Sequence, residues 1–273
     1  MELQHVTFGY RKHKPVLQDV SFTLKPGITV LLGENGSGKT TLIKNMLGLL
    51  QPDSGNVSIP QSGVRYLPQE FSVYPSLHVQ DILRFVAEEN GVERSQRDDC
   101  VRSAAQKANV LEFLNRRFSA CSIGTQKRVG IAATLIGSPR LAVLDEPTAG
   151  VDPKERMAFY QVVQEAFEGV SVLLSTHILD DLESLADSVL MLSKGKIVFA
   201  GTYQEYRSVL QGRLYAFSAP QRPAWLARYP VVSAHRVNGV QTWHFVSEQT
   251  PPDGDPISAT TEDIWTYLTG GSV

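Results

Sequence analysis

The chain has 273 residues, of which 42% are hydrophobic and 20% are charged, so it holds enough apolar material for a sizeable core. Its 26 Lys and Arg residues nearly balance its 28 Asp and Glu residues, and the formal net charge of −2 predicts no nucleic-acid partner. The two cysteines, Cys100 and Cys121, are too few for a disulfide-framed secreted protein and indicate a reducing compartment.

The first third of the sequence predicts strands around a glycine-rich loop. Apolar and polar residues alternate over Val6–Phe8 and Val20–Leu24, which is typical of strands with one covered face. Ile28–Leu32 is nearly all apolar, as expected of a buried parallel strand. A glycine-rich loop follows it, and then a helix is predicted over Lys39–Leu50. Val64–Leu67 predicts another strand.

The middle of the sequence predicts an α/β core with a helical insert. From Val79 to Leu114 the apolar residues recur at helical spacing. Beyond the insert, short apolar strands alternate with helices, the pattern of a parallel sheet with crossover helices. The strands are expected at Leu141–Leu144, Val170–Leu174 and Val189–Leu192, and the helices at Pro153–Phe167 and Ile178–Ala186.

The last seventy residues predict a small appended α+β unit. Lys196–Phe199 closes the preceding sheet, and Asn238-Gly239 predicts a hairpin turn between strands at Ser233–Val237 and Val240–Val246. Thr250–Pro256 is expected to be a loop, and Thr260–Leu268 a helix capped by Thr260 or Thr261. Seven aromatic residues are expected to form a small core here: Tyr215, Phe217, Trp225, Trp243, Phe245, Trp265 and Tyr267.

Neither a membrane span nor a signal peptide is predicted. The most apolar stretches are far shorter than the roughly 20 residues that cross a bilayer. The first seven residues include Glu2 and His5 and contain no apolar signal core. Any association with a membrane is therefore expected to come through docking on a partner.

The sequence from Gly33 to Thr40, Gly-Glu-Asn-Gly-Ser-Gly-Lys-Thr, fits the phosphate-binding loop pattern G-x-x-x-x-G-K-[ST] between a buried strand and a helix. Glycines let the backbone wrap a phosphate, and the exposed N–H groups at the helix start attract the anion. Lys39 supplies a charge for the β- and γ-phosphates, and the Thr40 hydroxyl is placed to ligate Mg²⁺. The expected nucleotide contacts in the loop are Gly33, Asn35, Gly36, Ser37, Gly38, Lys39, Thr40 and Thr41.

Two carboxylates follow the strand at Leu141–Leu144, where a parallel sheet presents ligands at the carboxyl ends of its strands. Asp145 is expected to hold Mg²⁺ through water. Glu146 is expected to polarise the attacking water as a general base, an effect typically of about 10²–10⁴-fold.

Further motifs occur in a fixed order around these two. They are Tyr10, Gln69 in Leu67–Glu70, Cys121–Thr125, Ala149–Asp152 and Ser175–His177. With the loop and the acidic pair, this order and spacing resembles the nucleotide-binding subunit of an ATP-binding cassette (ABC) transporter over about residues 1–202. The resemblance implies ATP and Mg²⁺ as ligands, ATP hydrolysis, and a head-to-tail dimer with two ATP molecules between the subunits.

The same resemblance assigns roles to single residues. Tyr10 would stack on adenine, with a core or edge-strand tyrosine as the alternative. Gln69 would touch Mg²⁺ or the lytic water and sense the membrane partner. His177 would contact the γ-phosphate and orient the water. Asp152 would line the dimer seam, and it is also a good N-cap for the helix that begins at Pro153.

The segment Cys121–Thr125 departs from the family signature Leu-Ser-Gly-Gly-Gln. Ser122 and Gly124 remain, and they would meet the γ-phosphate of the ATP bound to the other subunit. Ile123 replaces the first glycine and Thr125 replaces the glutamine, so both a homodimer and a heterodimer of ATPase subunits stay open.

The resemblance implies an α/β fold: a P-loop NTPase core with an N-terminal antiparallel β subdomain, a helical insert subdomain at about 76–138 and a C-terminal extension at 203–273. The implied function is the ATPase of an ABC transporter, peripheral at the inner face of the cell membrane through integral membrane permease subunits. The tail at Ala259–Gly270 resembles the ends of exporter subunits, which favours export. The alternative is a soluble ABC-type ATPase in repair, translation or assembly.

Overall fold

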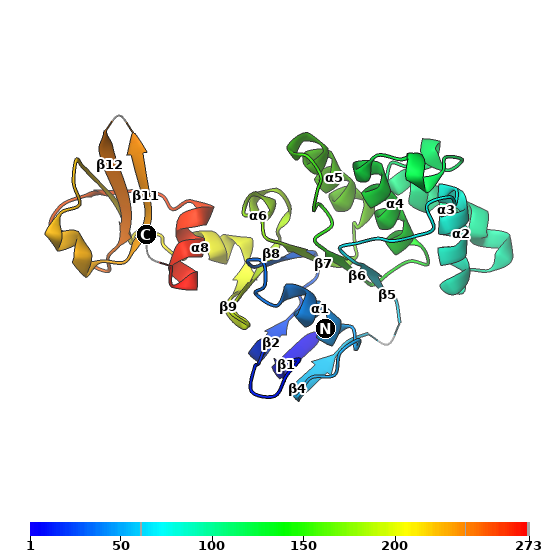
Figure 1. The fold of residues 1–273 in the computed structure, drawn as a ribbon, viewed down its shortest axis with the longest axis horizontal. Coiled ribbons are helices and arrows are strands. Elements are labelled where there is room, and N and C mark those ends of the chain that lie inside the picture. Colours follow the sequence, from blue (N-terminus) through cyan, green and yellow to red (C-terminus); the bar gives the residue numbers. More distant parts are fainter. Residues whose placement is uncertain (61, 238, 272–273) are drawn as a thin grey trace.

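The computed structural model describes residues 1–60, 62–237 and 239–271. Three sheets organise these residues: one of six strands, one of three and one of four. Figure 1 shows the six-stranded sheet in the middle, the three-stranded sheet below it, a helical lobe on one side and the C-terminal unit on the other. This is the predicted α/β architecture of a P-loop NTPase with appended units.

The six-stranded sheet has the order β5-β6-β7-β3-β8-β9, and all neighbours are parallel except β8 and β9. Every residue of β3 and β6 is buried, which explains why these strands are apolar without alternation. Because β3, β6 and β7 are parallel neighbours, the segments after Leu32, Asp145 and Thr176 emerge at one edge. The strands are β3 (Ile28–Leu32), β5 (Val64–Leu67), β6 (Leu141–Asp145), β7 (Ser171–Thr176), β8 (Ser188–Ser193) and β9 (Lys196–Thr202).

Three helices follow strands of this sheet and differ from their predicted limits. α1 (Lys39–Met46) ends four residues earlier than predicted, because the chain turns at Gly48, which has a positive φ of 70°. α5 (Pro153–Ala166) begins at Pro153 as predicted, with Asp152 as its N-cap. α6 (Asp180–Leu185) is two turns long and shorter than predicted.

The N-terminal sheet is antiparallel, with β1 (Glu2–Phe8) between β2 (Leu17–Thr23) and β4 (Ser54–Ser58). Only the second half of β1 is predicted from alternation, because the register shifts between Leu3 and Val6, where His5 has a positive φ. β4 is missed by the sequence pattern, since Ser54–Ser58 contains one apolar residue and is largely exposed.

The helical lobe, where the sequence predicts a helical insert, contains three α-helices: α2 (Val79–Glu89), α3 (Arg97–Lys107) and α4 (Ile123–Leu135). Short 3₁₀ turns lie between them at Arg94–Gln96, Leu111–Phe113 and Phe118–Ala120. α4 packs against β5 at Gly130, where an added Cβ would lie 2.6 Å from a Leu67 methyl. A glycine that is unfavourable by helix propensity is thus required by packing.

The C-terminal unit has the predicted paired strands, β11 (Val231–Val237) and β12 (Val240–Val246), although Asn238 of the predicted turn lies outside the described residues. Its predicted loop contains a short strand, β13 (Asp255–Pro256), which pairs with β10 (Leu214–Ala219). Thr260 caps α8 (Thr261–Thr269) through a capping box with Asp263. The remaining elements are α7 (Tyr203–Ser208) and a 3₁₀ turn at Ala224–Arg228.

The predicted aromatic core of this unit forms, with two exceptions. Trp243 and Phe245 are buried, and Tyr215, Phe217 and Trp225 pack on them. Trp265 and Tyr267, on α8, pack instead against the large cluster that includes the main sheet. α8 therefore attaches the extension to the core. No helix in the described part of the chain is long and apolar enough to span a bilayer.

Candidate functional site

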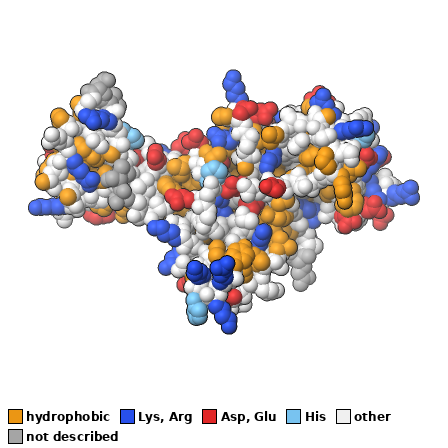
Figure 2. Space-filling view, viewed as in Figure 1, with side chains coloured by type: hydrophobic (Ala, Val, Ile, Leu, Met, Phe, Trp, Pro, Cys, Tyr) orange, Lys and Arg blue, Asp and Glu red, His pale blue; other side chains and the backbone are white. Residues whose placement is uncertain are grey.

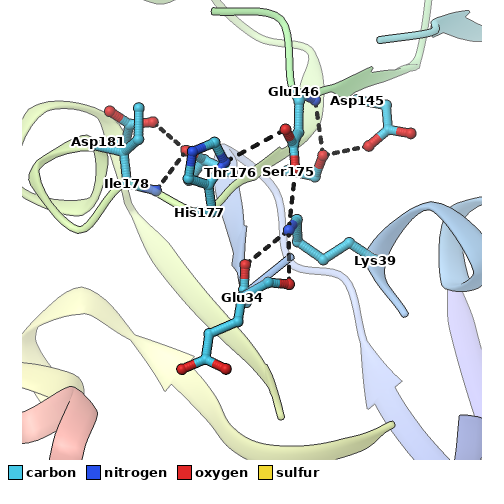
Figure 3. A network of polar contacts seen from close by, with 10 residues as sticks. Glu34, Lys39, Asp145, Glu146, Ser175, Thr176, His177, Ile178 and Asp181 are labelled. Atoms are coloured by element: carbon cyan, nitrogen blue, oxygen red, sulfur yellow. Dashed lines mark hydrogen bonds and ion pairs between the residues drawn. The ribbon is translucent and has the colours of Figure 1, made fainter. Parts of the chain in front are cut away.

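The loop between β3 and α1 wraps around the buried Lys39 side chain. Lys39 Nζ donates to the carbonyl of Gly33 at 2.7 Å and to that of Glu34 at 3.3 Å (Figure 3). Gly38 has a φ of 108°, a conformation that favours glycine. At Gly33 a Cβ would lie 2.5 Å from Ser37 Oγ, so the loop is closed there. Ser37 Oγ is itself buried and has no hydrogen-bond partner among the described residues, which leaves a polar atom for a ligand.

Asp145 and Glu146 stand at the end of β6, and Ser175 of the neighbouring β7 holds both. Ser175 Oγ donates to Asp145 Oδ1 at 2.5 Å and accepts from the backbone N–H of Glu146 at 2.9 Å (Figure 3). Asp145 is buried, and burial together with this carboxylate raises the pKa of Tyr66 to about 12. Glu146 has a φ of 43°, a left-handed conformation rare for a residue with a side chain and common at functional sites.

Lys39, Glu146 and His177 form one ionic group across three segments. Glu146 Oε1 lies 3.0 Å from Lys39 Nζ, and Glu146 Oε2 lies 3.4 Å from His177 Nδ1. Figure 3 shows the three side chains converging from the ends of β6 and β7 and from α1. A carboxylate, an ammonium group and an imidazole thus meet where the segments after β3, β6 and β7 emerge.

A pocket of about 490 Å³ opens at this group. It brings together nine of the predicted site residues: Asn35, Gly36, Gly38, Lys39, Thr40, Thr41, Gln69, Glu146 and His177. Gly33, Ser37 and Asp145 do not line the pocket. Gly33 accepts a hydrogen bond from the lining residue Lys39, and Ser37 and Asp145 are chain neighbours of lining residues. Tyr10 is outside the lining, 61% exposed, with its hydroxyl 3.3 Å from Thr41 Oγ1 and its ring edge-on to Phe8.

Ser122, Gly124 and Asp152 do not line this pocket. Ser122 is the N-cap of α4, and its hydroxyl accepts from the Thr125 N–H at 3.2 Å and lies 3.0 Å from Thr125 Oγ1. The substituted Thr125 therefore pairs with the signature serine. Ile123 is 58% exposed.

Sequence reasoning assigned no role to four residues that shape these sites. Ser175 could have been found, because a hydroxyl near the end of a strand beside the acidic strand can donate to the first carboxylate and accept from the backbone N–H of the next residue. Lys127 donates to the carbonyl of Gln69 at 2.7 Å, and burial lowers its pKa. Glu155 approaches Gly124 so closely that a Cβ there would lie 2.5 Å from its Oε2. Thr125 was treated only as a departure from the signature.

A phosphate-type loop after β3 at the carboxyl edge of a parallel sheet, with a buried lysine and two carboxylates at the end of β6, two strands away, defines a P-loop NTPase. Comparison with known proteins narrows the class. The family model "ABC transporter" matches residues 17–149. The energy-coupling factor transporter ATP-binding protein EcfA of Malacoplasma penetrans is 31% identical over 220 residues, covering 75% of this chain and 76% of that protein. The chain belongs to the ABC transporter ATP-binding family.

Two other similarities agree. The probable multidrug ABC transporter ATP-binding protein YbhF of Escherichia coli is 30% identical over 95% of this chain, which spans half of that protein. The structure of cbiO1 from Clostridium perfringens, part of the transporter complex cbiONQ, superposes with a TM-score of 0.68 at 25% identity, over 75% of this chain and 88% of that one. The chain is thus an ATP-binding subunit of the kind that hydrolyses ATP to power transport.

Proposed function

We propose that this chain powers an exporter, binding ATP in the pocket at Lys39 and hydrolysing it with Glu146 and His177. The observation that carries the proposal is the ionic group of these three side chains, 3.0 and 3.4 Å apart, at the edge where the phosphate loop and the acidic strand meet. Each of three segments contributes one residue: Glu146 follows β6, Lys39 begins α1 after the phosphate loop, and His177 follows β7.

Lys39 binds the β- and γ-phosphates. Its ammonium is buried and held by the carbonyls of Gly33 and Glu34, so it is oriented before nucleotide arrives. Backbone N–H groups of Gly36–Thr41 at the start of α1 add to the anion site. The side chain of Ser37, buried without a partner among the described residues, supplies a further hydrogen bond.

Glu146 acts as the general base and His177 orients the water and the γ-phosphate. The left-handed backbone of Glu146 and the Ser175 hydrogen bond to its N–H fix the direction of its carboxylate. With nucleotide present, Lys39 turns to the phosphates, and the carboxylate is freed to accept a proton from water.

The residues present fit Mg²⁺ brought in by the nucleotide. No group of three or more His, Cys, Asp or Glu side chains in the described ranges could hold a metal alone. Mg²⁺ commonly takes one or two protein ligands and completes its shell with phosphate oxygens and water. Thr40, Gln69 and Asp145 are the proposed partners, and the ion would neutralise charge on the transferred phosphoryl group.

We infer a head-to-tail dimer in which Ser122 and Gly124 of each subunit close the site of the other, with Asp152 along the seam. Tyr10, exposed and beside Thr41, supplies the ring for adenine. The start of α4 favours an anion. Both the pairing of Ser122 with Thr125 and the exposed Ile123 leave a homodimer and a heterodimer open.

The membrane partner docks on an apolar groove of about 500 Å³ beside α2. The groove includes Tyr74, Leu77 and Phe85, and Tyr74 is 79% exposed. Figure 2 shows hydrophobic side chains at the surface of this lobe. Phe71, three residues before Tyr74 in the chain, is not part of the lining and packs edge-on against Phe118. A cytoplasmic helix of a permease would fit the groove. The proposed location of the chain is accordingly the inner face of the cell membrane.

Export is the proposed direction because two observations favour it. The last helix and its surroundings, Ala259–Gly270, resemble the ends of exporter subunits, and the relative covering nearly the whole chain is named as a probable multidrug transporter subunit.

The test is ATP turnover by the purified chain. Glu146→Gln is expected to lower kcat by about 10²-fold or more while ATP still binds. Glu34→Gln is the matched control, because it also removes one negative charge near Lys39. Figure 3 shows the Glu34 carboxylate pointing away from Lys39. Wild-type turnover in Glu146→Gln would refute the assignment of the base. Export is tested separately, by the direction of substrate movement in inverted vesicles that contain the copurifying permease.

A further inference from the structure

Three buried polar side chains from three elements meet behind the pocket. Tyr160 comes from α5, Asp181 from α6 and Thr176 from the end of β7, and each is at most 2% exposed. The Tyr160 phenol donates to one oxygen of Asp181, and the Thr176 hydroxyl donates to the other. The Thr176 hydroxyl also accepts from the backbone N–H of Ile178 at 3.0 Å.

Burying this carboxylate and its two hydroxyl partners in a core costs free energy. Burial raises the pKa of Asp181, and the bonds from Thr176 and Tyr160 act in the opposite direction. No Lys or Arg within 4.0 Å pairs with Asp181 among the described residues; Arg156 acts only from farther away and Asp180 adds a like charge. Apolar side chains of similar size commonly stabilise a core as well or better, so a role beyond packing is indicated.

The position of the cluster identifies that role. Thr176 directly precedes His177, and Ile178 directly follows it, so the cluster holds the backbone on both sides of the imidazole (Figure 3). The Thr176 carbonyl also accepts from the N–H of Gly33 at 3.2 Å, which ties the same point to the phosphate loop. His177 is itself partly exposed, and its contact with Glu146 is a long 3.4 Å. Its orientation therefore depends on the backbone that carries it.

The cluster also lies near the segment that follows Glu146. Thr148, two residues after Glu146, is buried, and although burial raises the pKa of the Tyr160 phenol, the Thr148 side chain acts on that pKa in the opposite direction. Tyr160 thus lies between the segment after Glu146 and the segment that carries His177.

We propose that Tyr160 is a positioning residue for ATP hydrolysis, which through Asp181 and Thr176 holds His177 in place against the γ-phosphate and Glu146. The proposal rests on the function proposed above for His177. It assigns no contact with ATP to Tyr160, so it separates from that function by experiment.

The first experiment compares Tyr160→Phe with Tyr206→Phe in the full chain. Tyr206 is the matched control, since it is also buried and its hydroxyl donates to the Thr261 carbonyl at 2.9 Å, away from His177. Both variants lose one buried hydrogen bond and are expected to lower Tm. Tyr160→Phe is expected to lower kcat about tenfold or more with KM for ATP within about twofold, because small misplacements of a reacting group are costly. Tyr206→Phe is expected to keep wild-type kcat.

The second experiment asks whether the effect passes through His177. In a double-mutant cycle, Tyr160→Phe is expected to add little to the loss caused by His177→Ala, since residues that act as one unit are not additive. The side-chain NMR signals of His177, assigned by their loss in His177→Ala, are expected to shift in Tyr160→Phe and to stay in place in Tyr206→Phe.

The outcomes separate the two proposals. If His177→Ala loses turnover while Tyr160→Phe keeps it, or if the two losses are additive, the positioning role is wrong and the function of His177 stands. If His177→Ala hydrolyses ATP like wild type, the proposed function of His177 is wrong, and the positioning role is overturned with it.

Discussion

Glu146 and ATP are expected to compete for Lys39, and this competition gives a measurable affinity change. The Lys39–Glu146 pair is 3.0 Å long, and both side chains are at most 12% exposed. At an effective dielectric constant of about 20, two charges at that distance attract by about 5 kcal/mol. Desolvation offsets most of this attraction, and a net hydrogen bond between charged groups is worth about 1.5–3 kcal/mol. Phosphates must displace this bond before Lys39 can bind them.

Glu146→Gln removes the carboxylate charge and keeps a similar shape. Weakening the pair by about 1.4 kcal/mol would tighten ATP binding about tenfold. The assay is calorimetric titration with ATP in the presence of a chelator, so that hydrolysis does not intervene, at low and at moderate salt. Glu34→Gln is the control, because it changes the net charge of the site equally, while the Glu34 carboxylate points away from the Lys39 ammonium. Equal ATP affinity in the two variants would refute the competition.

Three more outcomes follow from the structure. In the Glu146→Gln background, Ser122→Ala is expected to abolish ATP-dependent dimerisation or to lower the dimer affinity about tenfold, as measured by sedimentation. Unchanged dimer affinity would contradict the role proposed for Ser122 at the start of α4. Tyr74→Cys is expected to crosslink to a cytoplasmic segment of the copurifying permease, whereas labelling confined to residues 203–271 would exclude the groove. Asp263→Ala is expected to lower the free energy of unfolding by about 1–2 kcal/mol at pH 7, because the Asp263 side-chain half of the α8 capping box and the 3.0 Å contact with His244 are lost. Burial raises the pKa of Asp263, but hydrogen bonding to its carboxylate outweighs this effect, and the folded-state pKa is lowered. The contribution of Asp263 to stability is therefore present above about pH 4 and is lost as the pH falls through the folded-state pKa. Denaturant unfolding of both proteins at pH 7 and pH 3 would measure the difference.

Local chemistry in the sequence was enough to predict the central strands and the phosphate loop. β3 and β6 are apolar throughout because both faces of a parallel strand are covered, so length and composition identify them. The loop pattern is equally local, since a turn at Gly38 and a lysine after it are needed wherever a phosphate is wrapped. For the same reason the sequence predicts Asp152, and either Thr260 or Thr261, as helix caps, because a cap acts within three residues of its helix start. The structure has Asp152 and Thr260 in these positions.

Tertiary structure decided what depends on contacts between distant segments. β4 lacks an apolar pattern and becomes a strand through pairing with β1. α4 contains glycines that weaken a helix, and only the close approach of Leu67 to Gly130 explains one of them. The ionic group of Lys39, Glu146 and His177 could be anticipated by chemistry, but the distances that make Glu146 a competitor for Lys39 arise from the strand order. The same holds for Tyr160, whose hydroxyl acquires a role only because α5 and α6 pack beside the end of β7, where it meets Asp181, 21 residues away in the chain.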